Sequence, residues 1–164
     1  MASTGILKGS MLMVFVGGSA IAFATSHSLS VTTNTTEVST KDHGAYPSVV
    51  ANTISWEVTT ENLCSDSAAN ASALLTLMKA KEPVTVKFAL VSNWDDNGLS
   101  SVSGAQGVQA WTAGTALAEG QAIITSLQVN APAGDNATMS ATFTGTGTLD
   151  QSVSGTQGVQ GAQA

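Results

Sequence analysis

The sequence contains no arginine, and only 10% of its residues carry a charge. A protein that reads nucleic-acid sequence normally presents arginine and lysine to the phosphate backbone. With five basic residues against eleven acidic ones, and a net charge of −6, this chain is not expected to bind nucleic acid in that way. Low charge combined with a positive mean hydropathy instead indicates a subunit whose uncharged surfaces are covered by neighbours.

Cysteine is almost absent as well. Cys64 is alone, which excludes an intrachain disulfide and a cysteine-based metal cluster. We interpret it as a small, partly buried filler. His27 and His43 have no second histidine or cysteine at zinc-ligand spacing. The Asp95-Asp96-Asn97-Gly98 sequence lacks the spacing of a calcium loop, so we interpret it as a solvated turn and predict no metal site.

Catalytic signatures are missing too. Serine, histidine and aspartate all occur, but no G-x-S-x-G nucleophile elbow is present, and no glycine loop of the phosphate-binding kind. The sequence therefore predicts a protein that is not an enzyme, with no catalytic residues and no cofactor.

What the chain does contain is alternation of apolar and polar residues, most clearly over residues 120–149. This pattern predicts two strands with one face in a core and one face polar, separated by a turn at Pro132 and Gly134. Serine and threonine, about a quarter of the chain, are typical of such polar strand faces. The buried face is predicted to contain Ile123, Leu127, Val129, Met139, Ala141 and Phe143.

Other elements follow from similar patterns. Residues 54–60 and 84–91 are predicted strands, the second with Val84, Val86, Phe88 and Leu90 on one side. One helix is predicted over about residues 66–81, capped by Ser65 or Asp66 and ended by Pro83, with an apolar stripe formed by Leu74, Leu75, Leu77 and Met78. Residues 34–52 are predicted to form a long extended loop or arm. The fold class is therefore mainly β, a barrel or sandwich with one flanking helix.

The N-terminal apolar run allows two interpretations. Lys8 followed by MLMVFVGGSAIAFA is typical of a signal peptide cleaved near Ala24, which would leave a secreted β-sandwich such as an adhesin or pilin-like surface subunit. Alternatively, residues 11–16 and 20–25 form a hairpin across Gly17-Gly18-Ser19. We favour the hairpin, because the composition does not change beyond the cleavage point.

The sequence also contains one short internal repeat. VSGAQGVQA at residues 102–110 recurs as VSGTQGVQG at residues 153–161. Nine residues are too few for a solenoid unit, so these are either equivalent edge or loop elements, or low-complexity sequence. We expect an N-terminal arm over residues 1–10, a single domain over 11–149 and a Gly/Gln-rich tail over 150–164.

Five segments lie in an order that resembles the tail tube (major tail) proteins of bacteriophages, over residues 11–149. They are GGSAIAFATSHSLSV, EVSTKDHGAYPSVV, SWEVTTENL, LLTLMKAKEPVTVKF and GQAIITSLQVNAPAGDNATMSATFTGTGTL. The resemblance implies a tail-tube-like barrel that assembles into hexameric rings, which stack into a hollow conduit for genome delivery. It also implies a place in the virion tail, after assembly in the host cytoplasm.

The implied partners are copies of the same chain and other tail proteins at the tube ends: tape measure, tail terminator, and baseplate or tip. DNA is expected to pass through the lumen without specific binding, past acidic residues that repel its phosphates. No membrane insertion is expected. Residues 34–52 are interpreted as an arm between subunits or rings. Its contact residues are predicted to be Thr40, Lys41, Asp42, His43, Gly44 and Tyr46.

Overall fold

The computed structural model describes residues 7–21, 23–64, 71–92, 94 and 111–151, which form an antiparallel sheet and one helix. The order of the strands in the sheet is β2-β1-β5-β6-β7-β4-β3. This architecture confirms the mainly β fold with a single flanking helix in the described part of the chain. The elements are β1 Leu12–Val16, β2 Ser19–Ala20, β3 Ala24–Glu37, β4 Val49–Leu63, α1 Ala71–Ala80, β5 Val84–Val91, β6 Ala113–Asn130 and β7 Thr138–Asp150, with short 3-10 turns at Gly9–Met11 and Lys41–His43.

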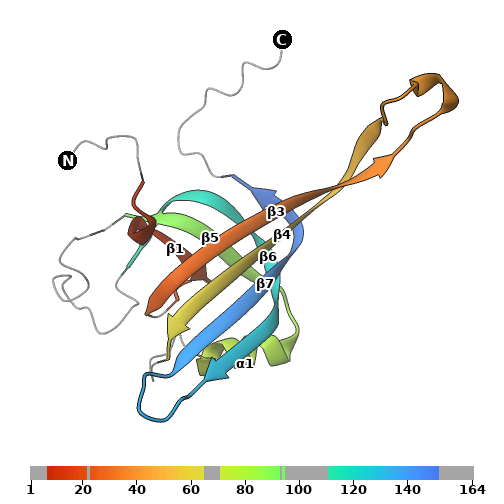
Figure 1. The fold of residues 1–164 in the computed structure, drawn as a ribbon. Coiled ribbons are helices and arrows are strands. Elements are labelled where there is room, and N and C mark those ends of the chain that lie inside the picture. The colour runs from red at the N-terminus through yellow and green to blue at the C-terminus, as the bar shows by residue number, and fades with distance from the viewer. Residues whose placement is uncertain (1–6, 22, 65–70, 93, 95–110, 152–164) are drawn as a thin grey trace.

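The sheet curls on itself (Figure 1). β2 and β3 stand at opposite ends of the strand order, yet only residues 21–23 separate them along the chain. The Ile21 N–H donates to the Val14 carbonyl at 3.1 Å, and the Leu63 N–H donates to the Phe23 carbonyl at 3.0 Å. The connection is thus tied to both ends of the sheet, which brings them together in a barrel-like arrangement.

The predicted N-terminal hairpin is confirmed, with a shorter second strand. Phe15 pairs with Ala20 across a turn in which Gly17 and Gly18 both have positive φ. All of β1 also pairs with β5, and its Val14 and Phe15 are buried on opposite faces of the sheet. A strand covered on both faces is apolar at successive positions, which explains the resemblance to a signal peptide. Cleavage near Ala24 would remove β1 and β2 from the sheet.

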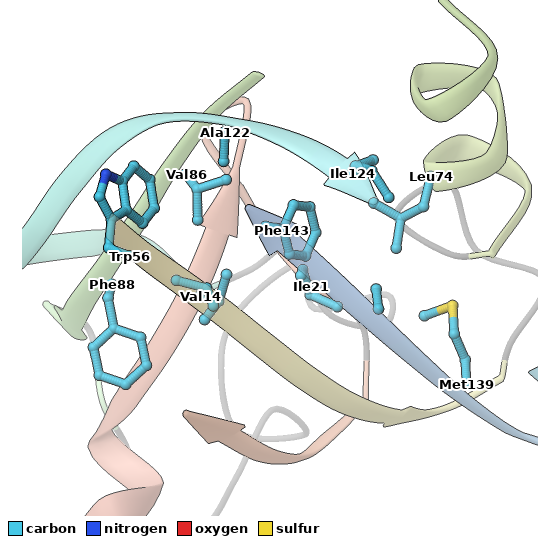
Figure 2. Packing of buried hydrophobic residues seen from close by; sticks show 12 residues of the cluster. Val14, Ile21, Trp56, Leu74, Val86, Phe88, Ala122, Ile124, Met139 and Phe143 are labelled. Carbon is cyan, nitrogen blue, oxygen red and sulfur yellow. The ribbon is translucent and has the colours of Figure 1, made fainter. Parts of the chain in front are cut away.

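Two hydrophobic clusters lie on opposite faces of the sheet, and Figure 2 shows the larger of them. The smaller contains Phe15, Ala89, Val91 and Trp111, and Trp111 stacks on Trp94 with ring centroids 5.3 Å apart. The larger fills the inside of the curled sheet. It consists of Val14, Ile21, Trp56, Val58, Leu74, Val86, Phe88, Ala122, Ile124, Met139, Ala141 and Phe143.

The predicted strand pair over residues 120–149 is confirmed as β6 and β7, but one buried face was wrongly predicted. Ile124, not Ile123, is buried: their exposed fractions are 5% and 37%. Between Ile124 and Ser126 the register with β7 shifts by one residue, a bulge at Thr125. One extra residue reverses the alternation, so Ile124 and Leu127 share the inner face although three positions separate them.

Strand β5 presents the face that was predicted for it. Val86 and Phe88 join the larger cluster as expected. Leu90 pairs with Leu12 and lies half-buried on this same face, whereas Ala89 and Val91 alternate into the smaller cluster on the opposite face.

Helix α1 is described over Ala71–Ala80, so the predicted capping residues Ser65 and Asp66 lie outside the described residues. Leu74 is buried against the larger cluster and Leu77 and Met78 pack beside it, whereas Leu75 is 44% exposed and does not belong to the predicted stripe. After the helix, Lys81 adopts a left-handed conformation with φ 58°, and Pro83 follows.

Candidate assembly site

A projecting arm is the most prominent feature of the surface (Figure 1). β3 and β4 stay paired from Val31↔Trp56 to Glu37↔Val49, but β4 pairs with β7 only from Glu57 onward. The outer half of this hairpin is therefore a two-stranded ribbon that extends beyond the sheet. It confirms an extended arm where residues 34–52 were predicted, although strand pairing leaves only residues 38–48 as the loop at its tip.

All six predicted contact residues lie at this tip. The Val38 N–H donates to the Ser48 carbonyl at 2.8 Å and closes the loop, which then makes a 3-10 turn at Lys41–His43. Gly44 follows with φ 70°. Thr40, Lys41, Asp42 and Gly44 are exposed, and Tyr46 is 84% exposed. The structure brings them together, but their role as contacts stays a prediction.

The arm exposes an unusual amount of apolar surface for a ribbon of two strands. An isolated hairpin is marginally stable in water, and contiguous exposed apolar side chains indicate an interaction surface. The arm is thus built to be covered by another molecule. Its exposed apolar side chains are Val31, Val38, Tyr46, Val49, Val50 and Ile54.

Trp56 fixes the root of the arm. Its indole is buried against the backbone of two glycines, and a Cβ added at Gly120 would lie 2.6 Å from Cζ2, while one added at Gly145 would overlap the ring. The indole Nε1 donates to the Gly147 carbonyl at 3.4 Å. Sequence reasoning missed this contact. Glycines inside a strand pattern at 145 and 147 are the signal that a bulky group approaches the backbone closely.

The long strands β3, β4, β7 and β6 form a wall with one polar face. Its side chains alternate with those of the larger cluster and point away from it; they include Ser26, Ser28, Ser30, Glu57, Thr59, Glu61, Ser126, Gln128, Ser140, Thr142 and Thr144. Neighbouring hydroxyls bond to each other, as Thr125 Oγ1 does to Thr144 Oγ1 at 3.0 Å. The face is therefore rich in hydroxyl and amide groups and nearly free of apolar side chains.

Charge on this wall has one sign. No lysine occurs in any of the four strands. Glu57 pairs across the sheet with Ser30 and Thr144, so hydroxyls flank its carboxylate on both sides. Glu61 lies in the same way between Ser26 and Ser140. Two carboxylates that form no ion pair with any described residue thus lie in the middle of the polar face.

The wall also has strand edges without a partner in the described part of the chain. β3 ends the strand order, so one side of its whole length bonds to no other strand. β6 pairs with β5 only as far as Ala122, so residues 123–130 of β6 have a strand neighbour only in β7, although α1 packs against β6. Unpaired strand edges are templates for pairing with another chain.

His27 is half-buried where β3 approaches β1, and both of its ring nitrogens are shielded from solvent. Neither ring nitrogen has a hydrogen-bond partner among the described residues, and nor does Oγ1 of Thr60, its cross-strand neighbour. Burial lowers the pKa of His27 to about 4. Beside the ring lies a cavity of about 460 Å³, lined also by Leu12, Phe88 and Trp111. The uncharged imidazole contributes to the packing between β3 and β1, where the two ends of the curled sheet approach each other.

Other candidates from the sequence have no site around them. Cys64 is half-buried against the larger cluster, as expected for a filler. No group of three metal-ligating side chains occurs among the described residues, and none of the helices described there could cross a bilayer. Asp95, Asp96 and both copies of the repeat lie outside the described residues.

A wall with free edges and a projecting arm indicates a subunit of an assembly, and comparison with known families agrees. The family model described as phage tail tube protein matches residues 11–151. The chain belongs to the phage tail tube protein family. It is therefore a structural component of the virion tail and not an enzyme. The match includes the apolar residues 11–16, now strand β1. No curated protein matches by sequence.

Solved tail structures have the same fold at low sequence identity. The tail of an empty gene transfer agent particle, refined with C6 symmetry, is 14% identical with a TM-score of 0.66, and the match covers 90% of this chain and 100% of that one. The SPP1 tail tube is 10% identical with a TM-score of 0.62, covering 90% and 80%. The cap of the anti-feeding prophage tube is 14% identical with a TM-score of 0.55, covering 92% and 95%.

Proposed function

We propose that six copies of this tail tube protein form a ring, and that stacked rings form the hollow tail through which the genome is delivered. The observation that carries the proposal is the wall of four long strands with unpaired edges and one polar face. Joining the β3 edge of one copy to residues 123–130 of β6 in the next uses two different surfaces. Such a contact closes into a ring when its rotation matches the symmetry, and the gene transfer agent tail has C6 symmetry.

The polar face of the wall lines the lumen in this arrangement. DNA phosphates are repelled by Glu57 and Glu61 and find no lysine on these strands to hold them. The hydroxyl and amide groups of this face bind water, and they carry no positive charge that would attract phosphates. Among the acidic residues, we therefore expect Glu57 and Glu61, in the middle of the polar face, to face the DNA.

Electron microscopy tests the assembly. Purified protein examined by negative stain is expected to show six-fold rings or hollow tubes. Persistent monomers at high protein concentration would contradict the proposal.

Charge reversal tests the direction of the polar face. Tubes of the double variant Glu57→Lys/Glu61→Lys are expected to retain short double-stranded DNA in sedimentation, and to release it as salt rises, because lysines would now bind phosphates in the lumen. Glu82→Lys, at an exposed position outside the four strands, is the matched control and should retain little DNA. Equal retention by the control would place the polar face elsewhere than the lumen.

The arm supplies contacts beyond the ring, through Thr40, Lys41, Asp42, His43, Gly44 and Tyr46 at its tip. Residues 11–149 act as the assembling domain, and residues 1–10 and 150–164 as its terminal extensions. At the tube ends, the strand edges and the arm contact other tail proteins: a tail terminator, the tape measure and the baseplate or tip. The shared fold of the anti-feeding prophage cap supports a terminator of related shape.

A further inference from the structure

A groove of about 900 Å³ opens at the root of the arm, on the face of the sheet opposite the polar wall. Its floor is apolar, formed by Val31, Ile54, Trp56 and Leu149. Its rim is polar and includes Asn52 and Asp150. Val31 pairs across the sheet with Trp56, and both share the inner face with the larger cluster. The groove is thus a continuation of the core that the described chain leaves open.

The exposure of this floor requires an explanation. Ile54 is 65% exposed and Val31 50%, whereas Trp56, one step further into the barrel, is 3% exposed. Apolar side chains on a core-facing stripe are stabilised when another apolar group removes them from water. An occupant of this groove would bury Ile54 and Val31 and complete the stripe.

We infer that the groove receives the arm tip of a second copy, with Tyr46 inserted over Ile54. This inference rests on the proposed tube and names the receptor of its arm. Tyr46 is the most exposed large hydrophobic side chain among the described residues, at 84%. Its ring suits an apolar floor and its hydroxyl a polar rim. Lys41 at the tip and Asp150 at the rim form no ion pair within the described chain, and they have opposite charges.

One subunit cannot make this contact with itself. Tyr46 lies at the tip and Ile54 at the root, and the five strand steps from Val49 to Ile54 alone span about 17 Å. The contact therefore joins different surfaces of two copies, head to tail. A head-to-tail contact that does not close on itself propagates as an open filament, which is the geometry that stacking of rings along a tube requires.

Disulfide crosslinking tests the contact directly. In a Cys64→Ser background, the double variant Tyr46→Cys/Ile54→Cys is assembled into tubes and oxidised. The crosslink needs Cα atoms within about 7 Å. A ladder of covalent species that extends beyond six chains is expected, because the contact passes from ring to ring. Tubes that assemble without any crosslink would overturn the inference and leave the tube proposal intact, whereas absence of tubes from the natural chain would count against the tube itself.

The same experiment distinguishes other occupants. A ladder that stops at six chains would place the arm within its own ring and overturn the head-to-tail stacking. A second double variant, Ile54→Cys/Val159→Cys in the Cys64→Ser background, tests the C-terminal residues as occupant. A crosslink within one chain of this variant, with none in Tyr46→Cys/Ile54→Cys, would assign the groove to the C-terminal residues of the same chain and overturn the inference.

Substitution of the inserted side chain gives an independent measurement. Tyr46→Ala is expected to raise the protein concentration needed for tube growth roughly tenfold, which corresponds to about 1.4 kcal/mol of interface free energy. Tyr46→Phe is the control and should stay within about threefold of the natural chain, since it keeps the ring. Ile54→Lys should impair growth as Tyr46→Ala does. Equal growth by all three variants would overturn the inference.

Discussion

At the scale of single residues, two side chains show how the barrel is held together. Trp56 needs glycine opposite it, because its indole occupies the space where a Cβ at Gly145 would be. His27 is kept uncharged by burial, and its ring nitrogens have no partner among the described residues. The packing of Trp56 depends on Gly145, and the surroundings of His27 include its cross-strand neighbour Thr60. Both therefore depend on residues far away in the sequence.

Gly145→Ala is expected to lower the free energy of unfolding of the monomer by about 1–3 kcal/mol, the usual cost of overpacking a filled core. The added methyl would displace Trp56 and weaken its bond to the Gly147 carbonyl. Urea denaturation below the assembly concentration measures the change. Gly9→Ala, where a Cβ meets nothing within 4 Å, is the control. Equal stability of the two variants would show that Trp56 does not pack on this glycine.

The burial of His27 predicts a pH dependence. Its pKa of about 4 in the folded chain lies below the ordinary histidine value of 6.5, so between these values the unfolded chain binds more protons. Stability is therefore lost as the pH falls from 6.5 toward 4. The contribution amounts to about 2 kcal/mol between pH 7 and pH 4.5, an upper value because the ring keeps some contact with solvent.

Urea denaturation of the natural chain and of His27→Leu at both pH values tests this. Carboxyl groups titrate in both proteins, so the difference between them isolates His27. His27→Leu should lose less stability on acidification than the natural chain. An identical loss in both would mean that His27 is accessible to protons in the folded state.

At the scale of elements, the arm is separable from the barrel. Its strands beyond Trp56 pair only with each other, and residues 38–48 contribute nothing to either hydrophobic cluster. A stable body and a projecting ribbon can therefore have different tasks: one builds the ring wall and the other reaches a neighbour.

Replacing residues 38–48 by Asn-Gly, a turn suited to joining two antiparallel strands, should leave the monomer folded and abolish long tubes. Circular dichroism and the urea midpoint of the monomer serve as the control, because no cluster residue is removed. Negative-stain microscopy reports tube length. Tubes of normal length in this variant would show that the tip makes no contact needed for stacking.

At the scale of the whole molecule, assembly places many copies with a net charge of −6 side by side. Repulsion between them opposes assembly and is screened by salt, whose Debye length falls from about 30 Å at 0.01 M to about 8 Å at 0.15 M. Tube formation is therefore expected to need less protein as salt rises, as measured by sedimentation. Glu57→Gln/Glu61→Gln should need less protein at low salt and depend less on salt. Inhibition of assembly by salt would indicate that attractive ion pairs dominate the contacts.

Most elements could be predicted because their signals are local. Alternation indicated β5, β6 and β7, the glycine turn indicated the β1–β2 hairpin, and Leu74 with Leu77 and Met78 indicated the inner face of the helix. What failed was the face of Ile123, since a bulge changes the alternation without any mark in composition. The burial of His27 and the packing of Trp56 on Gly145 were missed because they join residues far apart in the chain.

The sequence by itself determined the chemistry of the wall: four strands without a lysine, with serine and threonine at alternate positions, because a strand's side-chain period is a local property. Only the tertiary structure decided which strand edges stay unpaired, where β4 leaves the sheet to become an arm, and that a groove opens at its root. These depend on the order of strands and on the curl that joins β2 to β3, which are set by packing between distant segments.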